Sequence, residues 1–438
     1  LRGEIRELAA QRQVVRPADR GGDEATGMAA TGEADGGDVP PAATDDNDGA
    51  DAPPAATDDN DGAGARDGRV RLGGNFLLPP QTDHFQPERV GGTLKRFGTT
   101  PPGLNPIVEN AADVNDLHGL CNGTLAVRDR ADPSLWRSEL ATAVRIDNDY
   151  TTYTFDIRQD VYWQVPALAV DEPERFGWLD RRVELTAHDF VFAVEMAKHE
   201  EVQAPHAKAY LEDLERAVAV DDHTLRLEWS RKIYTSLGTS MALEPLPRHI
   251  YRFDQGGERM SDDQVPLAFN DHWFDERRGM TGVGRYLLWE YEADRGLRLR
   301  RNPDFWGVGE HFQWIDENSS IRDREARLTA FKNGQVHYNG LTATQFKTDI
   351  LDGGEGRFDR DDPRAGELAW ERVKGLGYSY IGWNMRRPLF RDRRVRQALT
   401  HAFPRQRIID EVFFGLGEQT EGPVHPESDY YHDGLSAY

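Results

Sequence analysis

The chain has 438 residues, of which 76 are acidic and 53 are basic, so its formal net charge at pH 7 is −23. This length allows roughly two to four domains. The acidic balance argues against a nucleic-acid-binding protein or one that binds an anionic membrane surface, because such proteins present basic faces. The single cysteine, Cys121, excludes an intramolecular disulfide and a cysteine-cluster metal site.

Residues 1–90 are predicted to be a disordered, acidic, low-complexity linker with a short helix at its start. The motif PPAATDDNDGA occurs twice, at residues 40–50 and 53–63, and contains no aromatic or large aliphatic side chain. Such a composition buries too little apolar surface to offset its ordering entropy. The DDNDG segments resemble part of a calcium loop, but neither copy has the glutamate that the EF-hand needs at its twelfth position, so we expect no calcium site.

From residue 91 the composition becomes that of a folded protein. A short strand is predicted before Pro101, and a helix is predicted from the N-cap Thr186, with Asp189 three residues later. A second helix is predicted to end at Gly334. Hairpins are predicted where alternating apolar residues flank polar turns, at Asp147–Asp149, Asp221–Asp222 and Asp294–Gly296. This mixture predicts an α/β or α+β protein with mixed sheets.

Residues 380–417 are crowded with arginine, and we interpret most of these arginines as the solvated side of two amphipathic helices. Asp392 is the predicted N-cap of the first helix, and Pro404 opens the second, which is stopped at Gly415. Arg393, Arg394 and Gln397 lie opposite the apolar face, which consists of Val395, Ala398, Leu399, Ala402 and Phe403. We expect this face to cover the core of a second lobe. A phosphate or nucleic-acid patch, or a carboxylate-binding role for one arginine, remains an alternative.

Six motifs occur in order between residues 91 and 426: YTFDIRQDVYW, LTAHDFVFAVEM, GVGRYLL, NPDFW, RLTAFKNGQV and the arginine-rich segment. In wording and spacing the chain resembles the extracellular solute-binding proteins, family 5, which serve peptide- and nickel-type ABC importers. The resemblance implies a two-lobed α/β fold, of the type II periplasmic-binding-protein kind, with mixed sheets and an extra small domain. It places the first lobe at residues 91–312, its inserted small domain at about 106–225, and the second lobe at 313–438.

The chain departs from the family pattern in several places. Residues 164–184 are inserted after Trp163, Pro404 stands where the family has aspartate, and GVGRY replaces the family's GTGPY. Family members also continue well beyond the point that matches Tyr438. We therefore expect the chain to be a fragment at both ends, with a C-terminally incomplete second lobe. As it stands, we expect it to be poorly soluble or partly molten and not to bind peptide.

The resemblance implies a function in binding. The ligand would be a peptide or another small solute held between two lobes, and the partners would be an ABC permease and its ATPase, with no nucleic acid. The protein would be periplasmic or otherwise extracytoplasmic, tethered to the membrane by an anchor not present in this chain. Two regions can be carried over as ligand-binding: the loop residues Glu109, Asn110 and Ala111, and His206 and Tyr210 of the small domain. The family's other pocket residues fall beyond Tyr438.

We expect no catalytic residue, cofactor or metal. The G-x-S-x-G elbow, H-E-x-x-H and the Walker sequence are absent, and the G-x-G in GMTGVGRYLL lacks the third glycine of a dinucleotide loop. Carboxylates are numerous, so an extracellular carbohydrate-active hydrolase that uses paired carboxylates is the alternative function. It would require two facing carboxyl groups about 5–10 Å apart on rigid elements.

Overall fold

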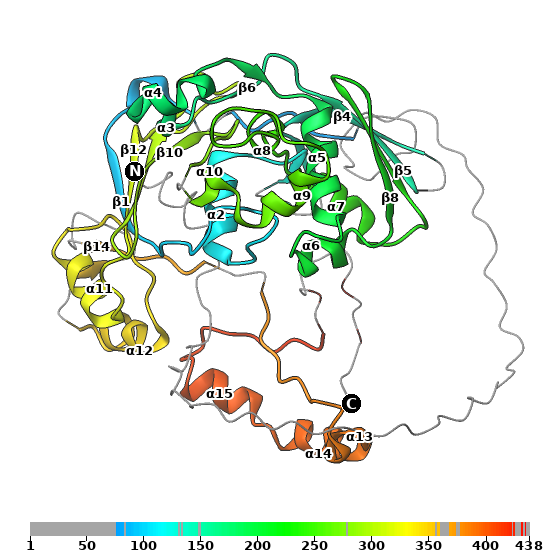
Figure 1. Cartoon of the computed structure of the whole chain (residues 1–438). Helices are drawn as coiled ribbons and strands as arrows, with labels where there is room; N and C mark the ends of the chain where they lie inside the picture. The colour runs from blue at the N-terminus through cyan, green and yellow to red at the C-terminus, as the bar shows by residue number, and fades with distance from the viewer. Residues whose placement is uncertain are drawn as a thin grey trace, which may run out of the picture. The chain divides into compact units, whose positions relative to one another are not determined.

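The computed structural model describes residues 76–434, except for residues 83–84, 130–131, 133–134, 148–149, 277–278, 355–356, 360–367, 374–376, 423, 425–430 and 432–433. The predicted N-terminal helix and both copies of the repeat lie outside the described residues. The mixed α/β architecture predicted from the sequence is present in the described part (Figure 1).

The first sheet is mixed and has the strand order β1-β12-β11-β10. Its strands are β1 (Thr93–Phe97), β10 (Tyr286–Glu292), β11 (Gly296–Arg301) and β12 (Trp314–Asn318). The outer strand β1 pairs in parallel with β12, whereas the β10–β11 and β11–β12 pairs are antiparallel. Helix α2 (Ala112–Cys121) packs Leu117 and Leu120 against Leu94, Leu299 and Ile315 of this sheet.

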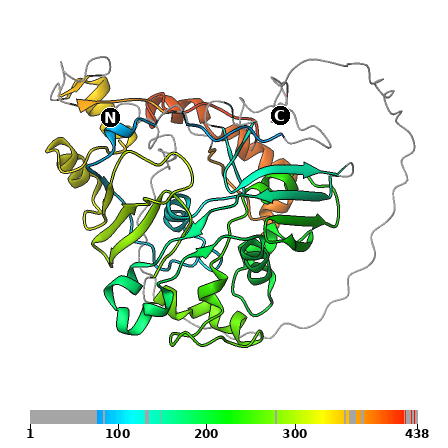
Figure 2. The ribbon, with the colours of Figure 1, turned by 90° about the horizontal axis from the view of Figure 1, so that it is seen from above.

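The second sheet is antiparallel and has the order β4-β5-β9-β8. Its strands are β4 (Ala141–Ile146), β5 (Thr152–Ile157), β8 (Leu214–Asp221) and β9 (Thr224–Trp229). Figure 2 shows this sheet, cyan to green, as a set of strands separate from the yellow-green strands β10–β12. The β4–β5, β8–β9 and β10–β11 pairs confirm the three predicted hairpins.

Helix α5 (Ala187–Lys198) packs against β8 and β9. It begins with the predicted capping box, in which the Asp189 carboxylate accepts a hydrogen bond of 2.9 Å from the backbone nitrogen of Thr186. The helix is buried on two sides. Phe190 and Val194 belong to one core cluster, and Phe192 belongs to another.

The remaining elements are short, and they connect or flank the two sheets. The two-stranded pairs are β2 (Ala126–Arg128) with β3 (Trp136–Ser138), β6 (Tyr162–Trp163) with β7 (Val183–Glu184), and β13 (Phe358–Asp359) with β14 (Leu368–Ala369). The other helices before residue 380 are α3 (Ala167–Asp171), α4 (Pro173–Phe176), α6 (Pro205–Tyr210), α7 (Ser236–Met241), α8 (Arg248–Tyr251), α9 (Gln264–Ala268), α10 (Trp273–Glu276), α11 (Arg324–Lys332) and α12 (Ala343–Phe346). Single 3-10 turns lie at Pro87–Arg89, Gly177–Leu179 and Phe269–Asp271, and a π-helical turn lies at Lys347–Leu351.

Three features of the structure bear on the domain limits predicted from the sequence. Folded structure is already present before residue 90, because Leu77 is buried in the core that contains the second sheet, and Leu78 exchanges backbone hydrogen bonds with Trp136 and Ser138. The first sheet continues past residue 312, because β12 is one of its inner strands. The second sheet continues past residue 225, because β9 ends at Trp229. The division into two lobes and a small domain stays a prediction.

The arginine-rich segment forms the two predicted helices, α14 (Arg393–Ala402) and α15 (Arg405–Glu411), and a short helix that was not predicted, α13 (Pro388–Arg391), precedes them. The Asp392 side chain caps α14 by accepting a hydrogen bond from the nitrogen of Arg394, as predicted. The core that the apolar face of α14 was expected to cover is not found among the described residues. Leu399 is 38% exposed and Phe403 is 41% exposed, because no described element buries this face.

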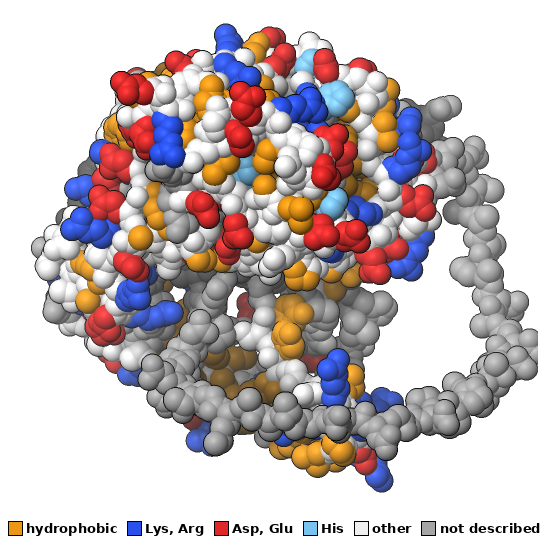
Figure 3. All heavy atoms as spheres, viewed as in Figure 1, with side chains coloured by type: hydrophobic (Ala, Val, Ile, Leu, Met, Phe, Trp, Pro, Cys, Tyr) orange, Lys and Arg blue, Asp and Glu red, His pale blue; other side chains and the backbone are white. Residues whose placement is uncertain are grey.

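No helix in the described part of the chain is both long enough and apolar enough to cross a membrane. On the face shown in Figure 3, acidic and basic side chains are interspersed over the described surface. This face therefore offers no single basic patch of the kind that binds phosphate backbones.

Candidate functional site

The loop between β1 and α2, residues 98–111, carries three of the five predicted ligand-binding residues. β1 ends at Phe97, and Pro101 and Pro102, which lack the backbone N–H that a strand ladder uses, follow in the loop. Asn105 then folds the chain back on itself. Its side-chain oxygen accepts hydrogen bonds of 3.0 and 3.2 Å from the backbone nitrogens of Ile107 and Val108. This local turn sets the course of the chain toward Glu109.

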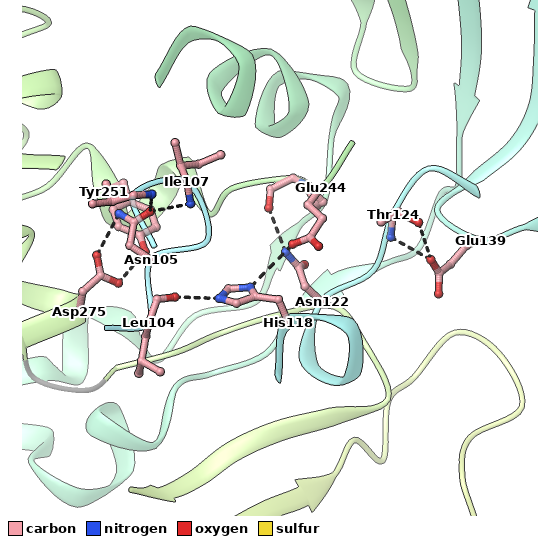
Figure 4. Close-up of polar contacts among 12 residues, drawn as sticks. Leu104, Asn105, Ile107, His118, Asn122, Thr124, Glu139, Glu244, Tyr251 and Asp275 are labelled. Atoms are coloured by element: carbon pink, nitrogen blue, oxygen red, sulfur yellow. Dashed lines mark hydrogen bonds and ion pairs between the residues drawn. The ribbon is translucent and has the colours of Figure 1, made fainter. Parts of the chain in front are cut away.

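Asn105 also attaches the loop to the rest of the body (Figure 4). Its amide nitrogen donates to the Phe269 carbonyl at 3.2 Å and to the Asp275 carboxylate at 3.3 Å. The Tyr251 hydroxyl donates to the other oxygen of Asp275 at 2.8 Å. Burial and the nearby Asp275 charge raise the pKa of Tyr251, so the phenol keeps its proton and remains a donor. All the hydrogen-bonding capacity of the Asn105 amide is thus used within the protein.

A second anchor of the same loop comes from α2. The buried His118 ring uses Nε2 to contact the Leu104 carbonyl oxygen at 2.7 Å, so Nε2 carries the proton. Burial lowers the pKa of His118 to about 4, although the bond to Leu104 acts in the opposite direction. The ring is therefore neutral at neutral pH.

Glu244 lies on the other side of the His118 ring, with 3.8 Å between its Oε2 and the ring Nδ1, too far for a hydrogen bond. Burial, and next the charge of Glu139, raise the pKa of Glu244. The Oε2 atom of Glu244 is shielded from solvent, which accounts for the upward direction. Glu139 itself accepts from the nitrogen of Thr124 at 2.8 Å (Figure 4).

The predicted residues occupy two segments. Glu109 is half-buried and covers Gly103 so closely that any side chain at Gly103 would overlap its carboxylate. Asn110 is exposed, and Ala111 stands at the N-cap of α2 without a side-chain cap. On α6, His206 is half-buried and Tyr210 is 70% exposed.

The two segments pack on a common core cluster, which Val108 contacts from the loop and Ala207 contacts from α6. Within the described part of the chain, no hydrogen bond or ion pair joins Glu109, Asn110 or Ala111 to His206 or Tyr210. The structure therefore brings the segments to one cluster but does not join the five side chains into one polar site.

A cavity of about 500 Å³ lies beyond the carboxyl ends of the parallel strands β1 and β12. Ligands of open α/β sheets commonly bind at this edge. None of the five predicted residues lines this cavity, whose walls include Thr100, Ser319, Arg322, Arg324, Arg327 and Tyr338. This cavity could not be predicted from the sequence, because β1 and β12 are far apart in the chain. No pattern within either segment indicates that the two strands pair.

Beneath this cavity Arg96 of β1 and Glu317 of β12 face each other in register and form a buried ion pair. Burial alone would lower the pKa of Arg96, but Glu317 and Tyr338 outweigh it and raise the pKa. This pair is neutral overall, and neither of its residues lines the cavity, so it does not change the charge of the lining. Among the described residues no group of three or more His, Cys, Asp or Glu side chains is arranged to hold a metal ion.

Comparison with known proteins identifies the family to which this chain belongs. Residues 136–438 match the family model described as bacterial extracellular solute-binding proteins, family 5 Middle. The oligopeptide-binding protein AppA of Bacillus subtilis is 26% identical over 326 residues, which cover 70% of this chain and 55% of AppA. The chain thus spans little more than half of the length of this relative.

Solved structures show the same fold. AppA from Bacillus subtilis, in complex with a nonapeptide, matches with a TM-score of 0.60 at 20% identity, over 79% of this chain and 60% of that one. DppA from Helicobacter pylori, in complex with the peptide STSA, matches with a TM-score of 0.59 at 19% identity, over 80% and 64%. NikZ from Campylobacter jejuni, in complex with Ni(L-His), matches with a TM-score of 0.56 at 18% identity, over 77% and 58%. These matches confirm the predicted α/β fold with mixed sheets.

Proposed function

Because this chain belongs to the bacterial extracellular solute-binding proteins, family 5, we propose that it acts as the substrate-binding component of an ABC importer. The observation that carries the proposal is the family match, which covers 303 residues, from 136 to 438, and includes most of the described body. The family consists of solute-binding proteins, so it does not support the alternative hypothesis of a carbohydrate-active hydrolase.

The proposed ligand is a peptide or another small solute. Support comes from the relatives, whose solved structures hold a nonapeptide, the peptide STSA and Ni(L-His). In this chain the ligand would meet the loop residues Glu109, Asn110 and Ala111, with His206 and Tyr210 contributing from α6. The two anchors at Asn105 and His118 favour this assignment, because a loop that is fixed before the ligand arrives costs less to order on binding.

The proposed partners are a membrane permease and its ATPase. Two lobes would close on the ligand by bending at a hinge, and the ligand would favour the closed form through its greater affinity for that form. The protein would work outside the cytoplasm, tethered to the membrane, with the acidic N-terminal segment as the linker. An acidic linker of this composition would keep the binding domain extended from its anchor.

The proposal is tested by titrating the purified 438-residue chain with STSA, a nonapeptide and Ni(L-His) in a calorimeter. The proposal predicts heat of binding from at least one of these ligands, whereas the expectation drawn from the sequence is that the chain as it stands does not bind peptide. Glu109→Gln and Tyr210→Ala should then weaken binding about tenfold or more, whereas the double variant Arg393→Gln with Arg394→Gln should change affinity by less than about tenfold. Binding that is unchanged in Glu109→Gln and Tyr210→Ala, or absent for every probe, would count against the proposed site and ligand class respectively.

A further inference from the structure

The cavity beyond β1 and β12 has a basic wall. Arg322, Arg324 and Arg327 line it together with a single carboxylate, Asp294, which pairs with Arg322 at 2.5 Å. Arg327 donates to the carbonyl oxygens of Gly98 and Ile321, so its guanidinium is held in place. Within the described part of the chain the Arg324 guanidinium has no ion-pair or hydrogen-bond partner. The lining therefore carries an excess of positive charge.

Two buried hydroxyl groups on the same wall lack hydrogen-bond partners among the described residues. Ser319 is only 6% exposed, and its Oγ has no hydrogen-bond partner among the described residues. The hydroxyl of Thr100 is shielded from solvent and likewise unpaired in the described part of the chain. A buried hydroxyl that lacks a hydrogen-bond partner destabilises the fold, so such groups point to a missing partner.

The two hydroxyls come from the carboxyl ends of the two parallel strands. Thr100 follows β1, and Ser319 directly follows β12. The arginines come from the segment after β12 and from the first turn of α11, whose backbone N–H groups add to the positive potential at that end. Asp323 caps α11 by accepting from the nitrogen of Ala326 and offsets part of this potential, so the arginines and hydroxyls carry the inference.

We propose that this cavity binds an oxyanion, a carboxylate or phosphate group, held by Arg324 and by hydrogen bonds that Ser319 and Thr100 donate once their side chains rotate to turn the shielded hydroxyls toward it. Three features coincide there: excess positive charge, unpaired buried donors and a volume of about 500 Å³. That volume exceeds the size of a single ion and lies in the range of small-molecule sites, so the oxyanion is one end of a larger molecule. The site is separate from the five residues of the proposed function and does not depend on peptide binding.

The test uses the full 438-residue chain and three sodium salts at equal ionic strength: phosphate, succinate and chloride. A ligand that binds only the folded state raises the melting temperature in proportion to its occupancy. We expect phosphate or succinate to raise the melting temperature above that in chloride, and the stronger of the two identifies the group. Arg324→Gln should weaken that anion's affinity about tenfold, whereas Arg324→Lys should retain part of it. Arg393→Gln, the same charge change on exposed α14, is the matched control and should have no effect.

Ser319→Ala separates a binding role from a structural one. Removal of an unpaired buried hydroxyl should leave the stability in chloride unchanged or slightly higher, while the stabilisation by phosphate or succinate should fall. Equal melting temperatures in the three salts, or an anion effect that survives both Ser319→Ala and Arg324→Gln, would overturn the proposal. Neither outcome bears on peptide affinity, so this proposal and the proposed function fail independently.

Discussion

At the scale of single residues, His118 links the stability of the fold to pH. Its pKa is lowered from 6.5 to about 4, chiefly by burial. Between these two values the unfolded ring binds a proton that the folded ring does not bind. The contribution of His118 to stability is therefore fully present above pH 6.5 and is lost as the pH falls toward 4. Glu244, whose pKa is raised, acts in the opposite sense, because its folded form holds a proton that the unfolded form has released.

The variant His118→Gln isolates this contribution, since the amide can still donate to the Leu104 carbonyl but does not titrate. In the wild type, the free energy of unfolding should rise more steeply between pH 4 and 6.5, by up to about 1.4 kcal/mol per pH unit, than in the variant. Urea denaturation at pH 4, 5, 6 and 7 measures both slopes. His249 and His272, whose pKa values burial also lowers, are present in both proteins and cancel in the comparison. Equal slopes would mean that His118 is not buried as a neutral ring.

At the scale of elements, the G-x-G at Gly282 and Gly284 has a packing role. A side-chain carbon at Gly282 would overlap the carbonyl oxygen of Cys121 at the end of α2, and one at Gly284 would overlap the carbonyl of Asn122. These backbone oxygens cannot move aside without shifting α2. The glycines let the segment before β10 pass directly against the helix that carries His118, which explains their spacing without a dinucleotide.

We expect Gly282→Ala to destabilise the protein by about 1–3 kcal/mol or more, because it overpacks backbone against backbone. Gly119→Ala is the matched control. Gly119 is exposed within α2 and has open space around its Cα, so alanine there should stabilise the protein by up to about 1 kcal/mol. Chemical denaturation of the two variants measures the contrast. A neutral Gly282→Ala would show that α2 and this segment do not touch in solution.

Elements whose signal lies within one segment were predictable, and those formed between distant segments were not. The capping box of Thr186 and Asp189 and the hairpin turns depend on residues a few positions apart, so the sequence pattern alone indicates them. The register that sets Arg96 opposite Glu317 joins strands more than 200 residues apart. The cavity depends on that register, which is why the sequence pattern did not indicate Ser319 and Thr100. The assignment of Glu109 rests on the family resemblance and stays a prediction.

At the scale of the whole molecule, burial is unevenly distributed along the chain. The first sheet forms a core cluster with α2, and the second sheet forms another with α5. In a third cluster, Leu328 and Phe331 of α11 pack with Phe97. No described residue of α13, α14 or α15 is buried. Apolar side chains in and beside these helices are nevertheless exposed, with Leu389 at 62% and Val412, the C-cap of α15, at 55%.

This distribution predicts that the apolar residues of α14 contribute little to the stability of the 438-residue chain. Leu399→Ala should change the free energy of unfolding by less than about 0.5 kcal/mol, as expected for a surface position. Leu328→Ala, in the buried face of α11, should cost about 2–5 kcal/mol because it leaves a cavity. Replacing both Leu399 and Phe403 with glutamine should also reduce self-association in sedimentation experiments, since exposed apolar patches favour it. If Leu399→Ala costs as much as Leu328→Ala, then another part of the protein covers α14 in solution, and the arginine-rich helices belong to a core rather than to the surface.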